Sequence, residues 1–298
     1  MTLYEKLMNL VDQGLVVLKV DDRGYQTFKY HRKVFYKNLW HLDDALLEAR
    51  GIVFDKDNNI AQRPFLKIFN LGENGHDVYD NRYYVVSEKV NGFMGAVSAG
   101  DDYNLLYSTT GSTTSDYVGL IKKHLTKENE NFIMAFQGYT YLFEVCDPSD
   151  PHIVEEEEGA WLIGMRNKKS GDMLSLTDLN KIAIAGNFKF KRPFHLSGVE
   201  LRERARDTKG EGYVVYEGDG IVPVLKIKSP HYLSKKALMR MGKNTVNQMY
   251  DSPREFRERL EEEFYGCLEW ILETFTKSEW ASMAEQKRRT ILEEYFNE

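Results

Sequence analysis

Short β-prone segments separated by polar turn clusters fill the sequence from about residue 15 to residue 232. No other feature of the sequence limits the possible folds as strongly as this pattern. The segments are rich in Val, Ile, Tyr and Phe. Two such runs joined by a short polar turn typically form an antiparallel hairpin. The turn clusters lie at residues 21–24, 55–59, 99–104, 168–172 and 217–220. We therefore predict mainly antiparallel sheets.

Helical patterns interrupt the β-prone region at a few places. Apolar residues recur at helical spacing in residues 115–125, 176–185 and 199–206. At the start of the chain, Thr2 and Glu5 have the spacing of a capping box, which predicts a short first helix. Helices beside antiparallel sheets define an α+β protein, and this is the fold class that we predict.

The texture changes again near residue 231. Apolar residues now keep one helical face, and charged residues occupy the other. We predict two to four helices there and no strand. The sequence thus suggests two domains, at residues 1–230 and 231–298, of which the second is small and all-α. The apolar positions of this face are Phe256, Leu260, Phe264, Leu268, Ile271 and Phe275.

Composition excludes several classes of protein. The 298 residues include 40 Lys and Arg against 46 Asp and Glu, a net charge of −6. This balance argues against a general nucleic-acid coat protein, but it allows an enzyme with a small basic cleft. No apolar run approaches the roughly 20 residues that span a membrane. Two cysteines cannot build a disulfide framework, so we expect reduced thiols and a cytoplasmic location.

Lys89 is the first candidate for chemistry. It follows the β-prone run 83–88, and Gly92 three residues later allows a sharp turn. Burial at a strand end favours the uncharged amine, so Lys89 can lose its proton near neutral pH and then act as a nucleophile. The spacing Lys-x-x-Gly also occurs at Lys168 and Lys209, so only the strand context distinguishes Lys89.

Further charged residues stand at the ends of other β-prone runs. Two glutamates lie beside apolar runs, where an unpaired charge is costly and a partner or metal is expected. Two lysines two residues apart share a strand face, as a phosphate clamp requires. Each pattern alone also suits a solvent-exposed strand position. In chain order these residues and two upstream cations are Arg50, Lys67, Glu144, Glu211, Lys226 and Lys228.

The order of these motifs resembles the covalent nucleotidyltransferases, the superfamily of ATP-dependent ligases and capping enzymes. Within it, the sequence is most similar to the RNA ligase 1 group of T-even phages. The resemblance covers roughly residues 35–235. It rests on the segments 48–54, 63–71, 88–92, 143–145, 211–214 and 226–229.

The resemblance implies a role for each motif. Lys89 would attack the α-phosphate of ATP and form a lysyl-AMP adduct. Glu144 would contact the ribose or a hydrated metal, and Glu211 would bind the metal at the α-phosphate. Two Mg²⁺ ions, with Mn²⁺ as a possible substitute, would be held largely through water. The remaining ATP-binding residues are Arg50 and Lys67 for the triphosphate, Phe69 near the adenine, Gly92 and Gly212 around the nucleotide, and Lys226 and Lys228 at the α-phosphate and the leaving pyrophosphate.

The implied function is an ATP-dependent RNA ligase that joins a 5′-phosphate to a 3′-hydroxyl through an adenylylated RNA end, in RNA or tRNA repair. Its partner is RNA, with no membrane and no obligate protein partner, in the host cytoplasm if a phage encodes it. The helical tail would help to select the RNA. The alternatives are a DNA ligase or capping-type enzyme with the same lysine chemistry, or a noncatalytic RNA-binding module.

One position departs from the family pattern. In residues 105–112 the family carries a lysine just before the glycine, whereas this chain has Thr110. A phosphate or ribose contact is then either lost or supplied from elsewhere, and Lys122 and Lys123 are the candidates that we consider.

Overall fold

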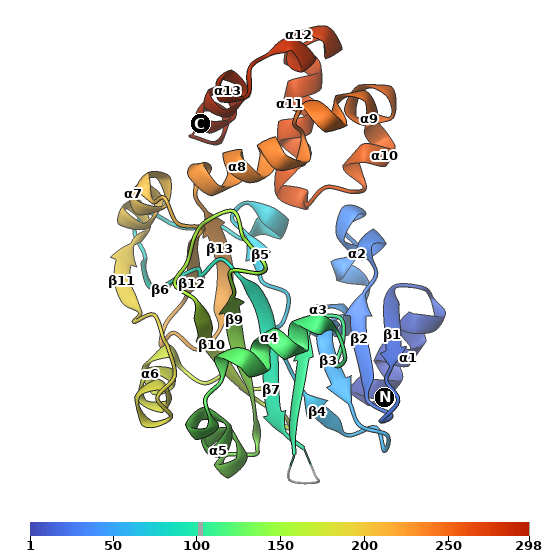
Figure 1. Ribbon diagram of the computed structural model, residues 1–298, viewed down its shortest axis with the longest axis vertical. Coiled ribbons are helices and arrows are strands. Elements are labelled where there is room, and N and C mark those ends of the chain that lie inside the picture. The colour runs from blue at the N-terminus through green and yellow to red at the C-terminus, as the bar shows by residue number, and fades with distance from the viewer. Residues whose placement is uncertain (101–103, 298) are drawn as a thin grey trace.

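Three β-sheets and a group of C-terminal helices make up the computed structural model, which describes residues 1–100 and 104–297 (Figure 1). The sheets are antiparallel except for one pair, and helices pack beside them, which confirms the predicted α+β class. Within the described residues, no helix has the length and apolar character needed to cross a bilayer.

The first sheet has the order β1-β2-β3-β4 and carries Arg50 at the start of β3. Helix α1 packs against it, and the Thr2–Glu5 capping box that predicts this helix is present. Helix α2, which the sequence analysis did not predict, follows β2. The elements are α1 (Leu3–Asp12), β1 (Val16–Val20), β2 (Gln26–Tyr30), α2 (Arg32–Tyr36), η1 (Trp40–Leu42), α3 (Ala45–Glu48), β3 (Arg50–Phe54) and β4 (Ile60–Gln62).

The second sheet has the order β10-β9-β7-β8, and three helices cover it. Two of these confirm the helices predicted at 115–125 and 176–185, while α5 is additional. The turn expected at residues 99–104 is centred on positions outside the described residues. The elements are β7 (Phe93–Ala99), β8 (Leu105–Thr109), α4 (Asp116–His124), α5 (Lys127–Ala135), β9 (Tyr139–Cys146), β10 (Gly159–Asn167) and α6 (Leu176–Ala185).

The third sheet has the order β11-β6-β12-β13-β5 and carries most of the candidate site. Its pair β13–β5 is parallel, with Leu225 opposite Phe69. Helix α7 confirms the helix predicted at 199–206. The elements are β5 (Phe69–Asn70), η2 (Glu73–Gly75), β6 (Tyr83–Glu88), β11 (Phe194–Ser197), α7 (Gly198–Asp207), β12 (Gly212–Tyr216) and β13 (Pro223–Lys228).

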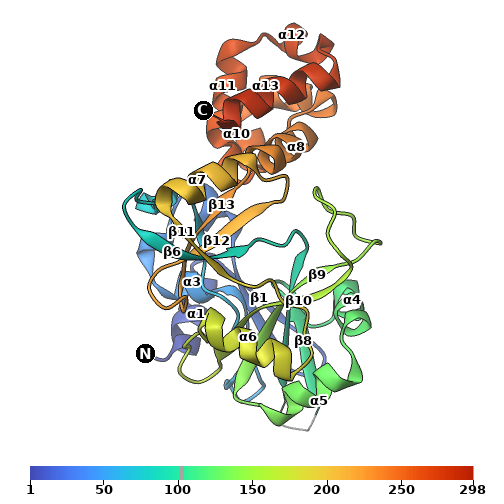
Figure 2. The same cartoon turned by 90° about the vertical axis from the view of Figure 1, so that its left-hand side faces the viewer.

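The C-terminal helices form a separate layer with its own core at one end of the molecule (Figure 2). The described part contains six α-helices, so the prediction of two to four was wrong. Pro253 starts one short helix, and a capping box at Thr276 starts another, which divides the expected long helices. The elements are α8 (Pro230–Arg240), η3 (Lys243–Thr245), α9 (Val246–Asp251), α10 (Pro253–Arg257), η4 (Glu262–Phe264), α11 (Tyr265–Thr274), α12 (Lys277–Ser282) and α13 (Glu285–Asn297).

Candidate active site

Lys89 lies directly after β6, next to the start of β12. The antiparallel pairing of these strands places Tyr213 opposite Glu88, and the Lys89 amide donates to the carbonyl of Gly212 at 2.9 Å. The Lys89 ammonium then reaches the Glu211 carboxylate, with Nζ and Oε2 2.8 Å apart. The sheet register therefore joins two motifs that stand 122 residues apart in the sequence.

The protonation of Lys89 differs from the expectation. Burial alone would lower its pKa, but the carboxylates of Glu211 and Glu144 outweigh burial and raise the pKa above its ordinary value. The prediction that Lys89 can lose its proton near neutral pH was therefore wrong for this state of the protein. The sequence argument considered burial without the neighbouring charges. Lys89 is an ammonium ion here, and becoming a nucleophile requires a weaker pull from these acids.

Glu144 and Glu211 both face Lys89, and the charge of Glu211 helps to raise the pKa of Glu144. Burial raises the pKa of Glu144, whose Oε1 accepts a hydrogen bond from the amide of Gly92 at 3.1 Å. Burial also opposes the charge on Glu211, yet Lys89 and Lys228 outweigh it and lower the Glu211 pKa. Asn91 fixes the Glu211 carboxylate with a further hydrogen bond of 3.0 Å. Asn91 was not predicted from the sequence.

Two predicted glycines are required by close backbone contacts. A Cβ on Gly92 would lie 2.3 Å from the carbonyl oxygen of Val145, and a Cβ on Gly212 would lie 2.1 Å from that of Ile227. Gly212 also has a φ of +135°, which L side chains rarely adopt. Both glycines thus let strands approach each other beside Lys89, and their contact with a nucleotide stays a prediction.

Four predicted cations gather beyond Glu211. Lys226 is the centre of this group: burial and the charges of Lys228, Lys67 and Arg50 lower its pKa well below the ordinary value. Lys228 also neighbours Glu211. The Arg50 guanidinium donates to the carbonyl of Leu66 at 3.2 Å. The structure therefore joins the cations and the Lys89 cluster into one continuous site.

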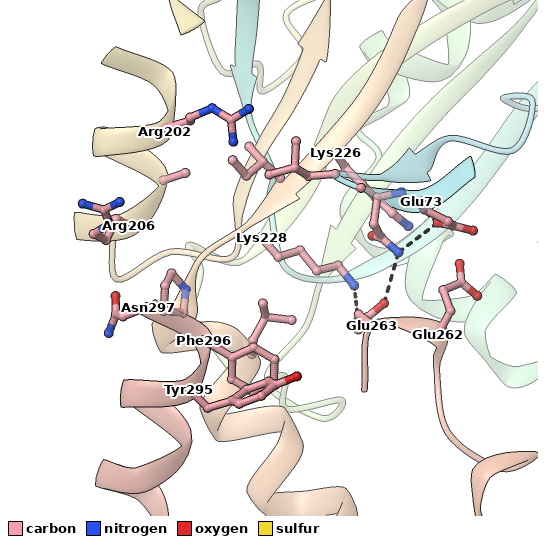
Figure 3. Close-up of a pocket in the computed structure, with 17 residues that line it drawn as sticks. Glu73, Arg202, Arg206, Lys226, Lys228, Glu262, Glu263, Tyr295, Phe296 and Asn297 are labelled. Atoms are coloured by element: carbon pink, nitrogen blue, oxygen red, sulfur yellow. Dashed lines mark hydrogen bonds and ion pairs between the residues drawn. The ribbon is translucent and has the colours of Figure 1, made fainter. Parts of the chain in front are cut away.

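Acidic residues that the sequence analysis missed cover part of this cation group. Lys67 Nζ lies 2.6 Å from Glu262 and 3.2 Å from Glu73, and Lys228 forms an ion pair with Glu263. Figure 3 shows the Lys228 and Glu263 side chains pointing toward each other, beside Glu73 and Glu262. These residues line a pocket of about 540 Å³ between β13, α7 and the C-terminal helices.

Phe69 lies in the hydrophobic core below the cations. Its ring contacts Trp40, at 5.8 Å between centroids, and His76, at 4.7 Å, and only 8% of its surface is exposed. Lys67 Nζ lies 5.1 Å from the ring centroid. Phe69 thus positions Lys67, and its predicted contact with adenine is not tested by this geometry.

The residues around Thr110 give the departure from the family pattern a structural setting. Lys123 binds Asp147, with Nζ and Oδ2 2.7 Å apart, and Lys122 lies 5.0 Å from the ring centroid of Tyr107. Lys29 instead approaches this turn, because a Cβ on Gly111 would lie 3.8 Å from Lys29 Nζ. Lys29 pairs with Arg50 in the sheet register, so it is the cation nearer to the candidate site.

A cluster of possible metal ligands lies outside the predicted site. His124, Asp147 and Glu158 have ligand atoms within 4.8 Å of one another. The Lys123 ammonium binds both Asp147 and Glu158, and His124 hydrogen bonds to Asp147 at 2.6 Å. The carboxylates therefore already have a cation, and we treat this cluster as an ion-pair network.

Known proteins are similar in sequence to this chain. RNA ligase 1 of bacteriophage TS2126 is 30% identical over 189 residues, which cover 57% of this chain and 48% of that protein. The chain spans about half the length of the curated relatives that it matches.

Solved structures share the fold over almost the whole chain. An archaeal ATP-dependent RNA ligase aligns with a TM-score of 0.64 at 15% identity, covering 98% of this chain and 76% of that one. A protein from Aquifex aeolicus assigned as an ATP-dependent DNA ligase aligns with a TM-score of 0.58 at 15% identity, covering 98% and 78%. At this level of identity the two likenesses establish the fold alone.

The sequence-based comparison goes further than the fold. The family model for RNA ligase of the T4 RNA ligase 1 type matches residues 48–232, which include the cations Arg50 and Lys67, the Lys89 segment, both glutamates and the Lys226–Lys228 pair. This match covers well over half of the chain, and the chain therefore belongs to this RNA ligase family.

Proposed function

We propose that this chain is an ATP-dependent RNA ligase that works through AMP bound covalently to Lys89. The observation that carries the proposal is the position of the Lys89 amine, next to Glu211 and on the same continuous site as the cations Lys226 and Lys228. Membership of the RNA ligase family supports RNA as the substrate.

The proposed reaction has three displacement steps at phosphorus. First, Lys89 Nζ attacks the α-phosphorus of ATP, the bond to the β-phosphate oxygen breaks, pyrophosphate leaves, and the amine proton passes to solvent. An oxygen of the RNA 5′-phosphate then attacks the adenylyl phosphorus, the P–N bond to Lys89 breaks, and Lys89 Nζ takes up a proton from solvent. Finally, a 3′-hydroxyl attacks the RNA 5′-phosphorus, a phosphodiester forms, the bond to the AMP oxygen breaks, AMP leaves, and the hydroxyl proton passes to solvent.

The chain contributes alignment and charge to these steps, which are the main demands of phosphoryl transfer. Lys67, Lys226 and Lys228 can neutralise the triphosphate and the leaving pyrophosphate, because they converge on one site. Burial opposes the positive charge on Lys226 and Lys228, and a bound polyphosphate would offset this cost. Glu211 and Asn91 orient Lys89.

The residues present fit a divalent metal. Glu144 and Glu211 are buried, both face Lys89, and offer hard carboxylate oxygens, the donor type that Mg²⁺ and Mn²⁺ prefer. When bound, such an ion would supply charge neutralisation at the α-phosphate. If these carboxylates bound the metal, they would attract the Lys89 ammonium less strongly, and the pKa of Lys89 would fall. We propose Mg²⁺ as the ion, largely held through water.

We also propose a division into a nucleotidyltransferase domain, residues 1–230, and a helical domain, residues 231–298, which helps to select the RNA. The separate hydrophobic core of the C-terminal helices supports this division. Both cysteines are free and buried, which supports a reducing, cytoplasmic location.

Labelling with radioactive ATP and Mg²⁺ tests the proposal. We expect wild-type protein to acquire a covalent AMP label, which Lys89→Ala abolishes and which is released when RNA bearing a 5′-phosphate is joined. The matched control is Lys168→Ala, which alters another Lys-x-x-Gly sequence on a turn after β10 and should keep the label. Label retained in Lys89→Ala, or joining of DNA in preference to RNA, would contradict the proposal.

A further inference from the structure

Three consecutive glutamates from the C-terminal helices, which we call the acidic segment, lie on the cations of the candidate site. Glu262 binds Lys67 at 2.6 Å, and Glu263 binds Lys228. Glu261 binds Arg240 at 3.1 Å. The side chains of Lys67 and Lys228 are 4% and 8% exposed, so these are buried ion pairs rather than surface ones.

Lys236, on α8, and Lys228 both form ion pairs with Glu263 of the acidic segment. Lys236 Nζ lies 3.4 Å from Glu263 and 3.2 Å from Glu261. The ammonium groups of Lys228 and Lys236 each lie 5.5 Å from the ring centroid of Tyr232, so the tyrosine holds both beside the same carboxylate. One anionic group bridged by two lysines is the arrangement in which a phosphate would be held.

The acidic segment fits this place imperfectly. Three buried oxygens there have no protein hydrogen-bond partner: Oε2 of Glu261, Oε2 of Glu262 and Oδ1 of Asn70. Glu262 and Glu73 compete for the single ammonium of Lys67. Unpaired buried oxygens cost free energy. They therefore weaken the binding of the acidic segment to the cations and make its displacement easier.

Lys226, in contrast to Lys67 and Lys228, lies mainly among other cations. The charged groups that shift the pKa of Lys226 are Lys228, Lys67 and Arg50, with Glu263 as the single acid among them. A polyphosphate carries more negative charge than Glu262 and Glu263, the two carboxylates of the acidic segment that pair with Lys67 and Lys228. It would therefore satisfy this group of cations better than the acidic segment does.

The acidic segment is held by the packing of the buried residues Leu260 and Phe264 and by its ion pairs, not by strand hydrogen bonds. It lies at the 3₁₀ turn η4 between α10 and α11, outside any sheet. Lys236, in contrast, lies on α8, which follows β13 directly after Ser229. Displacement of η4 would therefore leave Lys236 beside Lys228.

We propose that Lys236 is a further polyphosphate-binding residue of this site, and that Glu262 and Glu263 occupy the site until the β- and γ-phosphates of ATP displace them. This inference rests on the proposed function. It assigns the C-terminal helices a part in binding ATP, and it distinguishes ATP, which has the displacing phosphates, from AMP, which lacks them.

Calorimetric binding of ATP and of AMP, with Mg²⁺, tests the inference. We expect Lys236→Ala to weaken ATP binding about tenfold and Glu262→Gln with Glu263→Gln to strengthen it about tenfold, because a charge-assisted hydrogen bond is lost or a competitor removed. AMP binding should stay unchanged in both. The controls are Lys235→Ala, the adjacent lysine of α8, and Glu255→Gln, an exposed glutamate of α10.

A measurement on the wild-type chain avoids any loss of folding in the variants. Amide hydrogen exchange in residues 258–264 should become faster when ATP binds and stay unchanged with AMP. Slower exchange with ATP, weaker ATP binding in the double glutamine variant, or equal binding by Lys236→Ala and Lys235→Ala would overturn the inference alone. A wild-type chain that binds neither nucleotide contradicts the proposed function itself.

Discussion

The two ends of the candidate site differ in where their acidic residues come from. Glu144 lies on β9 and Glu211 directly precedes β12, so the sheet pairings fix both acids beside Lys89. Glu262 and Glu263, which face Lys67 and Lys228, come from a turn in the C-terminal helices. Moving the first pair would break strand hydrogen bonds, whereas moving the second breaks ion pairs and local packing. Glutamates are therefore a fixed part of one end of the site and a displaceable part of the other.

The first way to test this contrast is to remove a fixed acid. Glu211→Gln should slow adenylylation of Lys89 by about 100- to 1,000-fold, the usual cost of losing one preorganised charged group at a reacting centre. Glu211 accepts hydrogen bonds from both Lys89 and Asn91, so its charge orients the amine, and we expect the loss of this orientation to outweigh the lower Lys89 pKa in the variant. Single-turnover labelling with radioactive ATP measures the rate.

The control for this variant is Glu217→Gln, whose carboxylate is 52% exposed and pairs with Arg82 at the surface. It should react at the wild-type rate. If Glu211→Gln stays within about threefold of this control, Glu211 does not act on Lys89 in the way that the geometry indicates.

The second test uses pH. Because Glu211 and Glu144 raise the pKa of Lys89 despite burial, the fraction of free amine should increase about tenfold for each pH unit below that pKa. Single-turnover adenylylation should therefore accelerate steadily from about pH 6.5 to 9. Glu144→Gln removes one negative charge, which lowers the Lys89 pKa and moves the profile to lower pH. A wild-type rate that is flat across this range would contradict the assignment.

The two ends of the site also differ in how many of their residues could be predicted from the sequence. Lys89, Glu211, Lys226 and Lys228 were predicted because each stands at the end or on one face of a β-prone run, where local pattern and strand pairing act together. Glu262 was missed because its partner Lys67 is 195 residues away, and three acids in a helical region look like a solvated face. The Lys89 pKa was misjudged for a related reason, since its sign depends on charges that only the tertiary fold supplies.

A smaller effect concerns the stability of the displaceable end. Burial and the neighbouring Glu73 raise the pKa of Glu262 to about 7, from 4.5. Between these pH values the folded chain holds a proton that the unfolded chain releases, so wild-type stability should fall as pH rises from 5 to 7.5. Glu262→Gln has no such proton. The melting temperature of the wild type should therefore fall by about 5 °C relative to the variant over this range. If the melting temperatures of the wild type and the variant changed in parallel with pH, the pKa of Glu262 would be the same in the folded and unfolded chains.

The smallest expected effect concerns a cation for which neither end supplies an acid. Lys29 lies beside Arg50 and the Gly111 turn, and besides burial the groups that lower its pKa are the cations Arg50, Lys19 and Arg32. A cation placed among cations should attract the phosphates of ATP. Because most of the Lys29 side chain is exposed although its ammonium is partly buried, its charge is screened, and Lys29→Ala should raise the KM for ATP only about three- to fivefold at low salt, and less at high salt. Lys19→Ala, on the neighbouring strand β1, is the matched control. Equal KM values for the two variants would mean that Lys29 does not replace the family lysine absent at Thr110.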